Sequence, residues 1–268
     1  MRSSLYVPGS NARALEKAIG LPADMLIIDL EDAVPDQAKP DARQAAASLV
    51  SNGVPNKILA IRINSVDSIW YQQDVAALQG SKVDLLVLPK VESAATIEQV
   101  WRDLGIAMLA MIETPSGIYA AREIARHQAV AGLIAGTNDI AAETGIRPGP
   151  AREGLELALQ AIVLAASAVG KPRFDGVCNR LDDMEGFDAE CSQGVMFGFT
   201  GKTLIHPNQV AIANRVFGPG AGEVAEAEEL IAASRGGAQR FKGRMIEAMH
   251  VEEARITIER SQHGMDGT

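Results

Sequence analysis

Short apolar segments alternate along this chain with Ala-rich segments whose apolar positions recur with the period of an α-helix. The apolar segments predict eight strands, at residues 4–7, 25–30, 58–63, 85–88, 107–112, 132–135, 172–175 and 202–205. The helical pattern predicts helices at residues 11–19, 40–51, 94–104, 116–125 and 152–169. This alternation is typical of a parallel sheet with crossover helices. Because eight such strands close a barrel, we predict an α/β fold, a TIM-type (β/α)8 barrel with additional C-terminal helices.

The alternative architecture is a doubly wound open sheet. That fold normally has a Gly-rich phosphate-binding turn after its first strand. Here the first predicted strand is followed by Pro8-Gly9-Ser10-Asn11, and the chain contains no G-x-G-x-x-G sequence. The turn therefore favours the barrel.

The predicted barrel domain covers residues 1–217, and residues 218–268 form a helical extension. A Gly-rich break at residues 218–222 separates the two parts, and two amphipathic segments follow at 223–234 and 245–260. A closed barrel does not need these helices. We therefore expect them to cover a barrel end or to pack on a neighbouring subunit.

Composition narrows the class of protein. The 268 residues are 47% hydrophobic and include 25 Lys and Arg against 34 Asp and Glu, a net charge of −9, which disfavours nucleic-acid binding. Cys178 and Cys191 are too few for a disulfide framework or a zinc site. The first residues lack the apolar core of a signal peptide, and residues 155–169 are too short to span a bilayer. We expect a cytoplasmic protein with no membrane partner.

Polar residues follow almost every predicted strand. In a barrel, the carboxyl ends of the strands meet at one end, where catalytic side chains lie. Buried like charges repel one another there unless a cation or a ligand lies between them. The residues at these positions are Asp29, Glu31, Asp32, Arg62, Asn64, Lys90, Glu113, Asn138, Asp139, Asp175, His206 and Asn208.

These residue types indicate a divalent metal ion and an anionic substrate. The planar guanidinium of Arg62 is suited to bind a carboxylate. Carboxylate ligands, without Cys and with at most one His nearby, suit Mg²⁺, with Mn²⁺ as the alternative, and disfavour zinc. Glu113 and Asp139 follow consecutive strands and can share one ion, although the residues alone leave a structural role for this pair equally open.

The chain resembles the citrate lyase β-subunit family, the CoA-ester-lyase branch of the HpcH/HpaI aldolase superfamily. The resemblance covers nearly the whole chain, and its strength comes from the joint order and spacing of several motifs. These motifs are Arg2-Ser3-Ser4-Leu5-Tyr6-Val7-Pro8-Gly9, Asp29-Leu30-Glu31-Asp32-Ala33-Val34, Lys39 with Ala42-Arg43, Arg62-Ile63-Asn64, Leu88-Pro89-Lys90, Met111-Ile112-Glu113-Thr114, Asn138-Asp139 and Gly201-Lys202-Thr203-Leu204-Ile205-His206-Pro207-Asn208-Gln209.

The resemblance implies a Mg²⁺-dependent enzyme that makes or breaks a carbon–carbon bond between an acyl-CoA thioester and a 2-oxo acid of the oxaloacetate or glyoxylate class. It also implies a homo-trimer or hexamer. By the same resemblance Arg62 binds the oxo acid's carboxylate, and Glu113 and Asp139 bind the metal. The thioester side is formed by residues matching Tyr6, Arg13, Lys17, Ile205 and His206.

One motif departs from the family pattern. Lyases and synthases of this family commonly carry Gly-x-Met-Ile-Asp in the C-terminal tail, and its Asp is the proton donor, often in a neighbouring subunit's site. This chain reads Gly243-Arg244-Met245-Ile246-Glu247. The longer Glu247 side chain is the predicted general acid, and its extra methylene moves the carboxyl group, which casts doubt on the substrate more than on the metal site.

Several residues have an alternative interpretation. We expect Glu31, Asp32, Asn64 and Lys90 to support the residues that bind metal and substrate, with Lys39 and Arg43 forming salt bridges to Glu31 and Asp32. Lys90 as a Schiff-base lysine and His206 as a general base are the weaker readings.

Three alternative functions remain open. In the first alternative the chain is a subunit of a citrate lyase complex that uses an acyl-carrier-protein thioester. In the second it is a CoA-independent metal-dependent pyruvate-type aldolase, and in the third it is a non-catalytic relative. The basic segment at residues 235–244 is the one patch that suits an acidic carrier protein, and charge balance at a subunit contact is its simpler interpretation.

Overall fold

Eight parallel strands form a closed barrel in chain order in the computed structural model, which describes residues 1–265. Each of the eight predicted strands is confirmed, with ends shifted by up to two residues. The strands are β1 (Ser3–Pro8), β2 (Met25–Asp29), β3 (Ile58–Arg62), β4 (Leu85–Leu88), β5 (Met108–Ile112), β6 (Val130–Ala135), β7 (Arg173–Asp175) and β8 (Gly201–Leu204).

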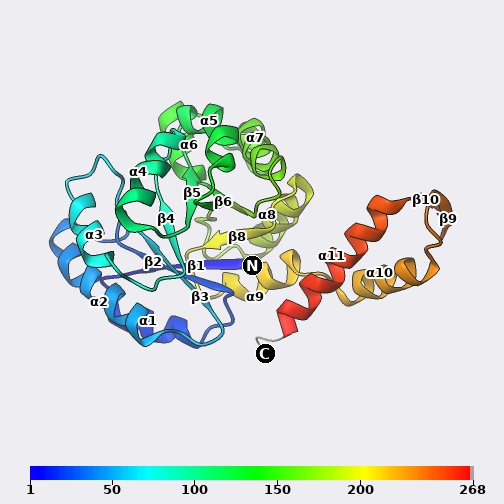
Figure 1. The fold of residues 1–268 in the computed structure, drawn as a ribbon, viewed down its shortest axis with the longest axis horizontal. Coiled ribbons are helices and arrows are strands. Elements are labelled where there is room, and N and C mark those ends of the chain that lie inside the picture. Colours follow the sequence, from blue (N-terminus) through cyan, green and yellow to red (C-terminus); the bar gives the residue numbers. More distant parts are fainter. Residues whose placement is uncertain (266–268) are drawn as a thin grey trace.

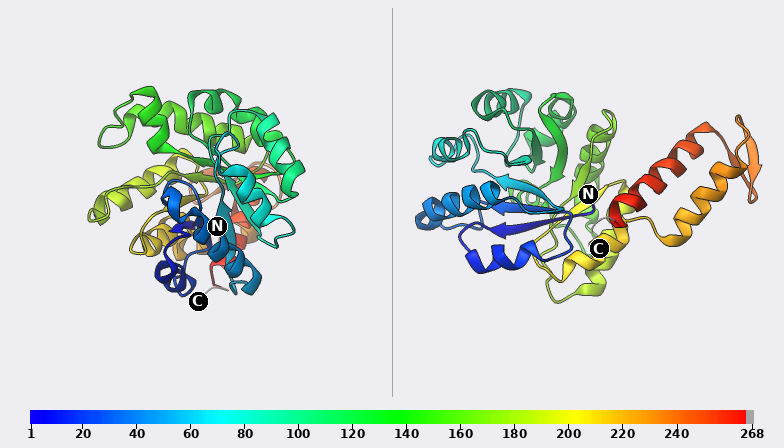
Figure 2. Two further views of the ribbon diagram at one scale, coloured as in Figure 1. Left: turned by 90° about the vertical axis from the view of Figure 1, so that its left-hand side faces the viewer. Right: turned by 60° about the horizontal axis from the view of Figure 1, so that its bottom comes forward.

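Helices surround this barrel, as the left panel of Figure 2 shows from the end opposite the chain's C-terminal extension. The five predicted helices are confirmed as α1 (Ala12–Ile19), α2 (Lys39–Asn52), α4 (Ala94–Leu104), α5 (Pro115–Arg126) and α7 (Glu156–Ser167). Four others have a weaker apolar periodicity or are short, and the sequence pattern did not predict them. They are α3 (Tyr71–Leu78), α6 (Thr137–Thr144), α8 (Met184–Phe197) and α9 (Gln209–Phe217).

Alternation along the strands divides the apolar core into two layers. In β2, Met25 and Ile27 point into the barrel and pack with Phe174 of β7. Leu26 and Ile28 point outward and pack under the helices. Both layers are almost completely buried, so the barrel is a packed core that holds the strand ends in fixed positions.

The C-terminal residues form a separate arm. Helices α10 (Ala221–Ala233) and α11 (Ala248–Met265) pack on each other, and a hairpin of β9 (Gln239–Phe241) and β10 (Arg244–Ile246) joins them at the far end. The arm has its own small core, which includes Leu230, Phe241 and Ile246. The sequence pattern predicted the helices and missed the hairpin, whose strands have three residues each.

The arm extends from the end of the barrel at which the strands begin (Figure 1). At its base the guanidinium of Arg260 donates a hydrogen bond of 2.5 Å to the carbonyl oxygen of Phe217, the last residue of α9. Within one chain, the arm therefore leaves the carboxyl ends of the strands uncovered. Packing of the arm on a neighbouring subunit remains a prediction. In residues 1–265 no helix combines the length and apolarity needed to cross a membrane.

Candidate active site

Arg62 lies at the centre of the polar cluster at the carboxyl end of the barrel. It is the last residue of β3 and pairs in register with Asp29, the last residue of β2. The guanidinium donates two parallel hydrogen bonds to the Asp29 carboxylate, Nε to Oδ1 at 2.7 Å and Nη2 to Oδ2 at 2.6 Å. This bidentate pair holds Arg62 in one orientation. The sequence analysis placed Asp29 among the strand-end residues and missed this pairing.

The remaining edge of the Arg62 guanidinium faces the loop after β2. Its Nη1 lies 2.9 Å from Glu31 Oε2, without the alignment of a hydrogen bond, and 3.6 Å from Asp32 Oδ2. The ring of Tyr6 covers one face of the guanidinium at 4.9 Å. We call Asp29, Glu31, Asp32 and Arg62 the Arg62 cluster. With three carboxyl groups and one guanidinium, it carries excess negative charge.

Burial shapes the protonation of this cluster. Desolvation raises the pKa of Glu31 to about 8, and the charges of Asp32, Glu113 and Asp29 add to that rise while Arg62 opposes it. Burial also raises the pKa of the Tyr6 hydroxyl. At neutral pH the cluster therefore favours a protonated Glu31, which reduces the negative charge that faces Arg62 Nη1.

Glu113 follows β5 and is 2% exposed, and Asp139 lies half-buried in the first turn of α6. The backbone N–H of Lys90 donates a 2.7 Å hydrogen bond to Glu113 Oε1. Desolvation raises the pKa of Glu113 to about 7, the Lys90 hydrogen bond lowers it, and the charge of Asp139 raises it further. The structure thus brings together the two carboxylates that were predicted to share a metal ion.

Two backbone features fix the position of Glu113. Lys90 has a φ of 51°, in the left-handed region, and this conformation aims its amide at the carboxylate. Gly136 lies directly against Glu113, because a Cβ built on Gly136 would come within 2.3 Å of Glu113 Cβ and 2.6 Å of Oε2. Only a glycine leaves room for Glu113 in this position.

The donor set at Glu113 and Asp139 fits Mg²⁺. Both ligands are hard carboxylate oxygens, and Mg²⁺ in proteins typically takes one or two carboxylates and completes its shell with water and substrate oxygens. Among the residues whose side chains the structure describes, 1–261, no group of three or more His, Cys, Asp or Glu is placed to hold a metal ion. Burial and the charge of Asp139 raise the pKa of Glu113 more than Arg62 and Lys90 lower it, so a further cation between the two carboxylates would stabilise their ionised forms.

Two cavities flank the Arg62 cluster. The first, which we call the Arg62 cavity, has a volume of about 290 Å³ and contacts β1, β2, β3, β6 and the loops after β7 and β8. Glu113 does not line it directly, whereas Gly136 does. Its lining includes Tyr6, Asp29, Asp32, Arg62, Met111, Gly136, Asn138, Asp139, Val177, Asn179, Thr203 and Ile205.

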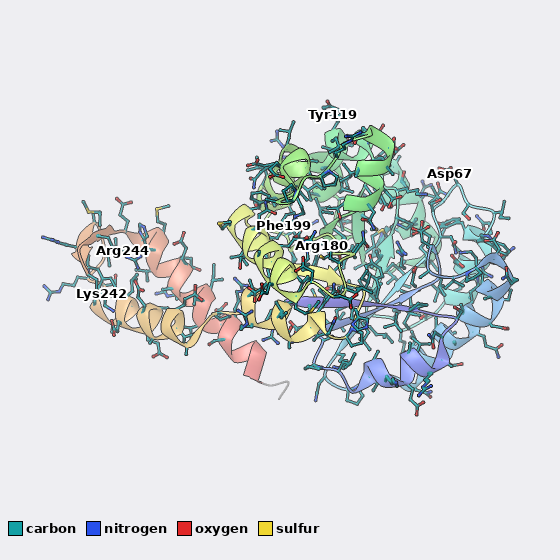
Figure 3. All side chains as sticks on the ribbon, turned by 180° about the vertical axis from the view of Figure 1, so that it is seen from behind. Asp67, Tyr119, Arg180, Phe199, Lys242 and Arg244 are labelled. Carbon is teal, nitrogen blue, oxygen red and sulfur yellow. The ribbon has the colours of Figure 1, made fainter. Side chains whose placement is uncertain are left out.

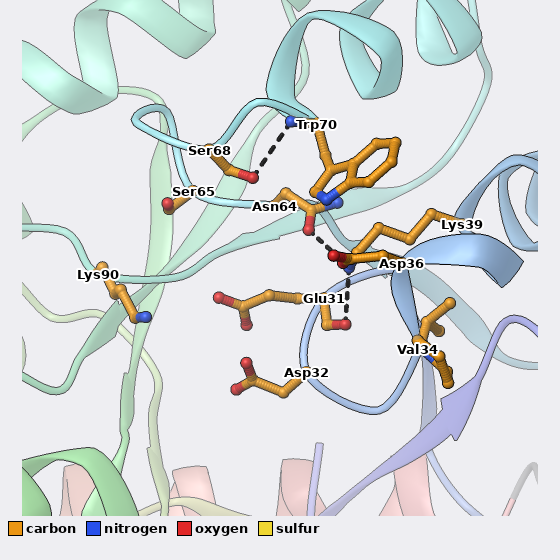
Figure 4. Close-up of a pocket in the computed structure, with 11 residues that line it drawn as sticks. Glu31, Asp32, Val34, Asp36, Lys39, Asn64, Ser65, Ser68, Trp70 and Lys90 are labelled. Carbon is orange, nitrogen blue, oxygen red and sulfur yellow. Dashed lines mark hydrogen bonds between the residues drawn. The ribbon is translucent and has the colours of Figure 1, made fainter.

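The second cavity, which we call the Trp70 cavity, has a volume of about 410 Å³ (Figure 4). Glu31 and Asp32 point across it toward Lys90, and Trp70 lies on its opposite wall. Asp32 lines both cavities. The Lys90 side chain lines this cavity and not the Arg62 cavity, so its contact with the carboxylate pair is made by the backbone, which disfavours the Schiff-base reading.

The residues behind the Trp70 cavity correct one prediction. The ammonium of Lys39 donates to the carbonyl oxygens of Leu30 and Glu31 and to Asn64 Oδ1 at 2.8–2.9 Å, and makes no salt bridge to the side chains of Glu31 and Asp32. Arg43 pairs instead with the fully buried Asp74 at 2.6 Å. The expected salt bridges were wrong because the loop turns its carbonyl groups toward Lys39.

Asp74 is a residue that the sequence analysis missed. Its Oδ2 accepts hydrogen bonds from the backbone N–H and the Nδ2 of Asn64, at 2.8 and 2.7 Å. Asn64 Nδ2 also donates to the Leu30 carbonyl at 3.0 Å, and Oδ1 accepts from Lys39. Asn64 therefore supports the loop that carries Glu31 and has no polar group left for a ligand. Asp74 lies on α3, a helix that the sequence pattern did not predict, so nothing in the sequence indicated its role.

The residues expected on the thioester side lie in two places. Tyr6 and Ile205 line the Arg62 cavity. Arg13 and Lys17 are exposed, one turn apart on α1, and line neither cavity. His206 is exposed, and its Nδ1 lies 2.6 Å from Asn208 Oδ1, so its ring is engaged by its own loop. This contact favours a structural role for His206 over a general base.

Glu247 lies far from this cluster in its own chain. It is exposed, directly after β10 at the tip of the arm, and its backbone N–H donates to His250 Nδ1 at 3.0 Å. The basic residues beside it are paired within the arm: Lys242 with Glu229 and Arg244 with Glu226 (Figure 3). For Lys242 and Arg244, the structure therefore favours the interpretation that the basic segment balances charge.

Asp175 differs from the other strand-end acids. Phe174 points into the barrel, so Asp175 points outward, where it is fully buried between Arg152 and Lys202. Glu190 of α8 completes this group, 2.9 Å from the Lys202 ammonium. We call Arg152, Asp175, Glu190 and Lys202 the Lys202 cluster. The expectation that Asp175 joins the functional residues was wrong, because the strand turns it to the helical side.

Comparisons with known proteins agree with this geometry. Residues 2–207 match the family model of HpcH/HpaI aldolase/citrate lyase. The chain is 42% identical to a (3S)-malyl-CoA thioesterase of Cereibacter sphaeroides, over 97% of this chain and 94% of the relative. It is 32% identical to the L-malyl-CoA/beta-methylmalyl-CoA lyase of Rhodobacter capsulatus, over 97% and 94% of the two chains.

A solved structure shares the fold and the arm. Protein CitE from Mycobacterium tuberculosis, in complex with magnesium, acetoacetate and coenzyme A, superposes with a TM-score of 0.84 at 30% identity, covering 97% of this chain and 98% of that one. The match of the family model over most of the chain and the coverage of these relatives lead to one conclusion: this chain belongs to the HpcH/HpaI aldolase/citrate lyase family.

Proposed function

We propose that this chain is a Mg²⁺-dependent carbon–carbon lyase that cleaves a 3-hydroxyacyl-CoA of the malyl-CoA class into an acyl-CoA and a 2-oxo acid. The observation that carries the proposal is the juxtaposition of a fixed guanidinium, Arg62, with the buried carboxylate of Glu113 and the half-buried carboxylate of Asp139. An α-hydroxy carboxylate needs both, a planar cation for its carboxylate and a metal for its hydroxyl oxygen. The family and the malyl-CoA and CitE relatives support a CoA-ester enzyme with a divalent metal.

The residues of this chain divide the work of the cleavage. The Arg62 guanidinium binds the substrate carboxylate through Nη1, because Asp29 already occupies its Nε and Nη2 edge. Tyr6 covers the guanidinium and excludes water from that face. Mg²⁺ held by Glu113 and Asp139 would supply the positive charge that lowers the pKa of the substrate hydroxyl.

The bond that breaks joins the carbon bearing the hydroxyl to the carbon next to the thioester carbonyl. As the hydroxyl proton passes to solvent water, its oxygen becomes the keto oxygen of the oxo acid, and the bonding electrons pass to the thioester as an enolate. The enolate carbon then takes a proton from a general acid to give the acyl-CoA. Arg62, fixed by Asp29, stabilises the developing anion on the oxo-acid side.

We assign the general acid to Glu247 of a neighbouring subunit. In its own chain Glu247 lies at the tip of the arm, which extends from the opposite end of the barrel. Its exposed position, beside exposed Met245 and Met249, suits contact with a second copy. The proposal therefore includes a homo-oligomer, for which the family resemblance suggests a trimer or hexamer.

The second candidate function is hydrolysis of the same thioester. It is favoured by the 42% identity to a relative named as a (3S)-malyl-CoA thioesterase. In this reaction water attacks the thioester carbonyl, the C–S bond breaks, and the products are the free hydroxy acid and CoA thiol. The two reactions share the binding of the α-hydroxy carboxylate and differ in the bond that breaks.

The carrier-protein alternative has less support. An acidic acyl carrier protein would need a basic docking patch, and Lys242 and Arg244 of the arm are already paired with Glu229 and Glu226. A CoA-independent aldolase shares the metal site, and it would act without the thioester. Both alternatives are outcomes of the test below.

The test is an assay of the purified protein with Mg²⁺ and malyl-CoA, methylmalyl-CoA or citryl-CoA. Oxo acids are trapped as hydrazones, and free CoA thiol is measured in parallel. Oxo acid without free thiol is the expected result and establishes the lyase, whereas free thiol without oxo acid establishes the thioesterase. Chelation by EDTA and Glu113→Ala should abolish either reaction.

Other outcomes contradict the proposal. Cleavage only of a carrier-bound thioester would point to a citrate lyase subunit, and aldol cleavage of a CoA-free hydroxy acid would point to the aldolase. No product from any substrate, by a protein that still binds Mg²⁺ and oxaloacetate, would identify a non-catalytic relative.

A further inference from the structure

Two loops form one wall of the Arg62 cavity, residues 176–183 after β7 and 205–208 after β8. Val177 and Asn179 reach the cavity from the first loop, and Ile205 reaches it from the second. The ladder between β7 and β8 pairs only Phe174 with Gly201 and Asp175 with Lys202. Beyond that point the sheet makes no contribution, so the two loops depend on other contacts for their relative position.

Gln209, the first residue of α9, supplies those contacts. Its side chain is completely buried. Its Nε2 donates a 3.0 Å hydrogen bond to the carbonyl oxygen of Cys178, in the loop after β7. Its Oε1 accepts hydrogen bonds from the backbone N–H groups of Ile205, at 3.1 Å, and His206, at 3.3 Å, in the loop after β8. The amide group of Gln209 therefore links both loops from the buried side, and Asn208 Nδ2 adds an exposed link by donating to the Leu181 carbonyl oxygen at 3.1 Å.

A further contact extends this link to the metal-ligand loop. Asn179 Nδ2 donates a 2.7 Å hydrogen bond to Asn138 Oδ1, and Asn138 directly precedes Asp139. This exposed contact does not involve Gln209, so it ties the loop after β7 to the start of α6 on its own. The ends of β6, β7 and β8 are thus connected by side-chain hydrogen bonds.

This wall differs in charge from the rest of the cavity. The opposite side presents Asp29, Asp32, Arg62 and Asp139, all charged. The wall held by Gln209 presents Val177, Asn179, Thr203 and Ile205, none of which is charged. An α-hydroxy carboxylate fits the charged side, and the uncharged thioester and its pantetheine chain fit the other.

We propose that Gln209 is a positioning residue that sets the width of the cavity for the thioester arm of the substrate. The inference rests on the proposed function insofar as it takes the substrate to be a CoA thioester. Gln209 touches neither substrate nor metal and acts through the backbone of Cys178, Ile205 and His206. Its loss should weaken binding of the CoA part and leave binding of the oxo acid intact.

Two variants separate the hydrogen bond that Gln209 donates to Cys178 from the two that it accepts from Ile205 and His206. Gln209→Met keeps the length of the side chain and leaves the Ile205 and His206 N–H groups and the Cys178 carbonyl without partners. Gln209→Glu keeps an acceptor for both N–H groups and removes the donor to Cys178. The matched control is Gln160→Met on α7, which removes one hydrogen bond to the Phe197 carbonyl outside the barrel.

Hydrogen exchange gives a readout that does not depend on activity. In Gln209→Met we expect exchange of the Ile205 and His206 amides to rise about tenfold, together with exchange across residues 176–182. Gln209→Glu should raise exchange in residues 176–182 alone. Gln160→Met should change neither segment. Unchanged exchange in Gln209→Met would show that the hydrogen bonds of Gln209 do not hold the two loops in position.

Binding and kinetic measurements test the role of Gln209 in binding the CoA part of the substrate. In Gln209→Met the Kd of coenzyme A and the KM of the thioester should rise about tenfold, with a smaller change in kcat, while the Kd of oxaloacetate with Mg²⁺ stays at the wild-type value. Raised exchange with unchanged CoA binding would show that Gln209 holds the loops for stability alone. Equal loss of CoA and oxaloacetate binding would show a general collapse of the cavity.

The outcomes distinguish this inference from the proposed function. A wild-type protein that turns over no thioester contradicts the proposed function, and the CoA and oxaloacetate affinities of the variants still test Gln209. Should Gln209→Met fail to fold, Gln209→Glu retains two of the three hydrogen bonds and supplies the same comparison for the loop after β7.

Discussion

The Arg62 cluster and the Lys202 cluster are two buried groups of charges with opposite designs. The Lys202 cluster balances two cations, Arg152 and Lys202, against Asp175 and Glu190, with contacts of 2.8–3.6 Å. It lies between β7, β8 and α8, closed off from both cavities. The Arg62 cluster opposes one guanidinium to Asp29, Glu31 and Asp32, and it borders both cavities.

Their protonation follows this difference. Burial alone would raise the pKa of Asp175, and the nearby charges of Lys202 and Arg152 outweigh it, so that the pKa is lowered. In the Arg62 cluster, burial and neighbouring carboxylates raise the pKa of Glu31 to about 8. A cluster whose carboxylates are fully paired with cations fixes structure, whereas a cluster with surplus negative charge beside a cavity marks a candidate site for ligands.

The largest expected effect comes from Arg62→Lys. Lysine keeps the positive charge and loses the planar fork that pairs with Asp29 and presents Nη1 to the substrate. We expect kcat/KM to fall about 10³-fold, with a free energy of unfolding close to wild type. Steady-state kinetics and urea unfolding of the same preparation measure both. A large loss of stability with a small loss of activity would reverse the roles of the two clusters.

Lys202→Met should have the next largest effect, on stability. It leaves Asp175 with Arg152 alone, whereas Glu190 keeps Arg152 and the partly exposed Arg180, 3.2 Å from its Oε2, and we expect the free energy of unfolding to fall by about 3 kcal/mol. Adding Glu190→Gln to this variant should restore part of the loss, because it removes a carboxylate that has lost its Lys202 partner. If the single variant is as stable as wild type in urea unfolding, the cluster is not structural.

Gly136→Ala tests the packing of the carboxylate pair. The new methyl group would overlap Glu113 Cβ and Oε2, so we expect a loss of about 2 kcal/mol in stability and weaker Mg²⁺ binding by calorimetry. Gly222→Ala in α10 is the control, since nothing lies within 4 Å of its added Cβ. Normal Mg²⁺ affinity in Gly136→Ala would mean that Glu113 does not need this position to bind metal.

The smallest expected effect is the pH dependence of Mg²⁺ binding. A metal ligand must be ionised, and the pKa of Glu113 is about 7. Protons therefore compete with the metal as pH falls below 7, and affinity should drop about tenfold per pH unit. The raised pKa also means that the metal-free protein loses stability as pH rises from about 4.5 to 7, because over this range the folded state still holds a proton that the unfolded chain has already released.

The Lys202 cluster should show the opposite sign. Because the pKa of Asp175 is lowered in the folded state, its contribution is complete above the ordinary pKa of Asp and is lost as pH falls below it. Calorimetric Mg²⁺ titrations at pH 5, 6, 7 and 8 test the Glu113 prediction, and urea unfolding extended from pH 7 down to pH 3 tests the Asp175 prediction, because the ordinary pKa of Asp is 3.8. A Mg²⁺ affinity that does not vary between pH 5 and 8 would argue that Glu113 is not a ligand.

Strand number and the identity of the polar residues at the strand ends could be predicted, because both are local patterns. Eight short apolar segments with helical segments between them specify a barrel, and a barrel brings its strand ends together. The helices α3 and α6 were missed because they combine eight residues with a weak apolar pattern, whereas the equally short α1 has a strong one, and the strands of the arm's hairpin have only three residues each.

The direction of each strand-end side chain could not be predicted. β7 has Phe174 as its one large apolar residue, so its alternation does not reveal which face Asp175 occupies. The bidentate pair of Asp29 and Arg62 depends on the register of β2 against β3, and the placement of Glu113 depends on a left-handed Lys90 and on Gly136.

By itself the sequence determined a (β/α)8 barrel, an acidic surface and a set of strand-end residues that indicate metal and carboxylate chemistry. Only the tertiary structure decided which acids border the Arg62 cavity, which one is locked into the Lys202 cluster, and where the arm holds Glu247. The reason is physical. Periodicity and residue type are properties of short segments, whereas burial, register and charge balance arise from segments far apart in the chain that meet only in the closed barrel.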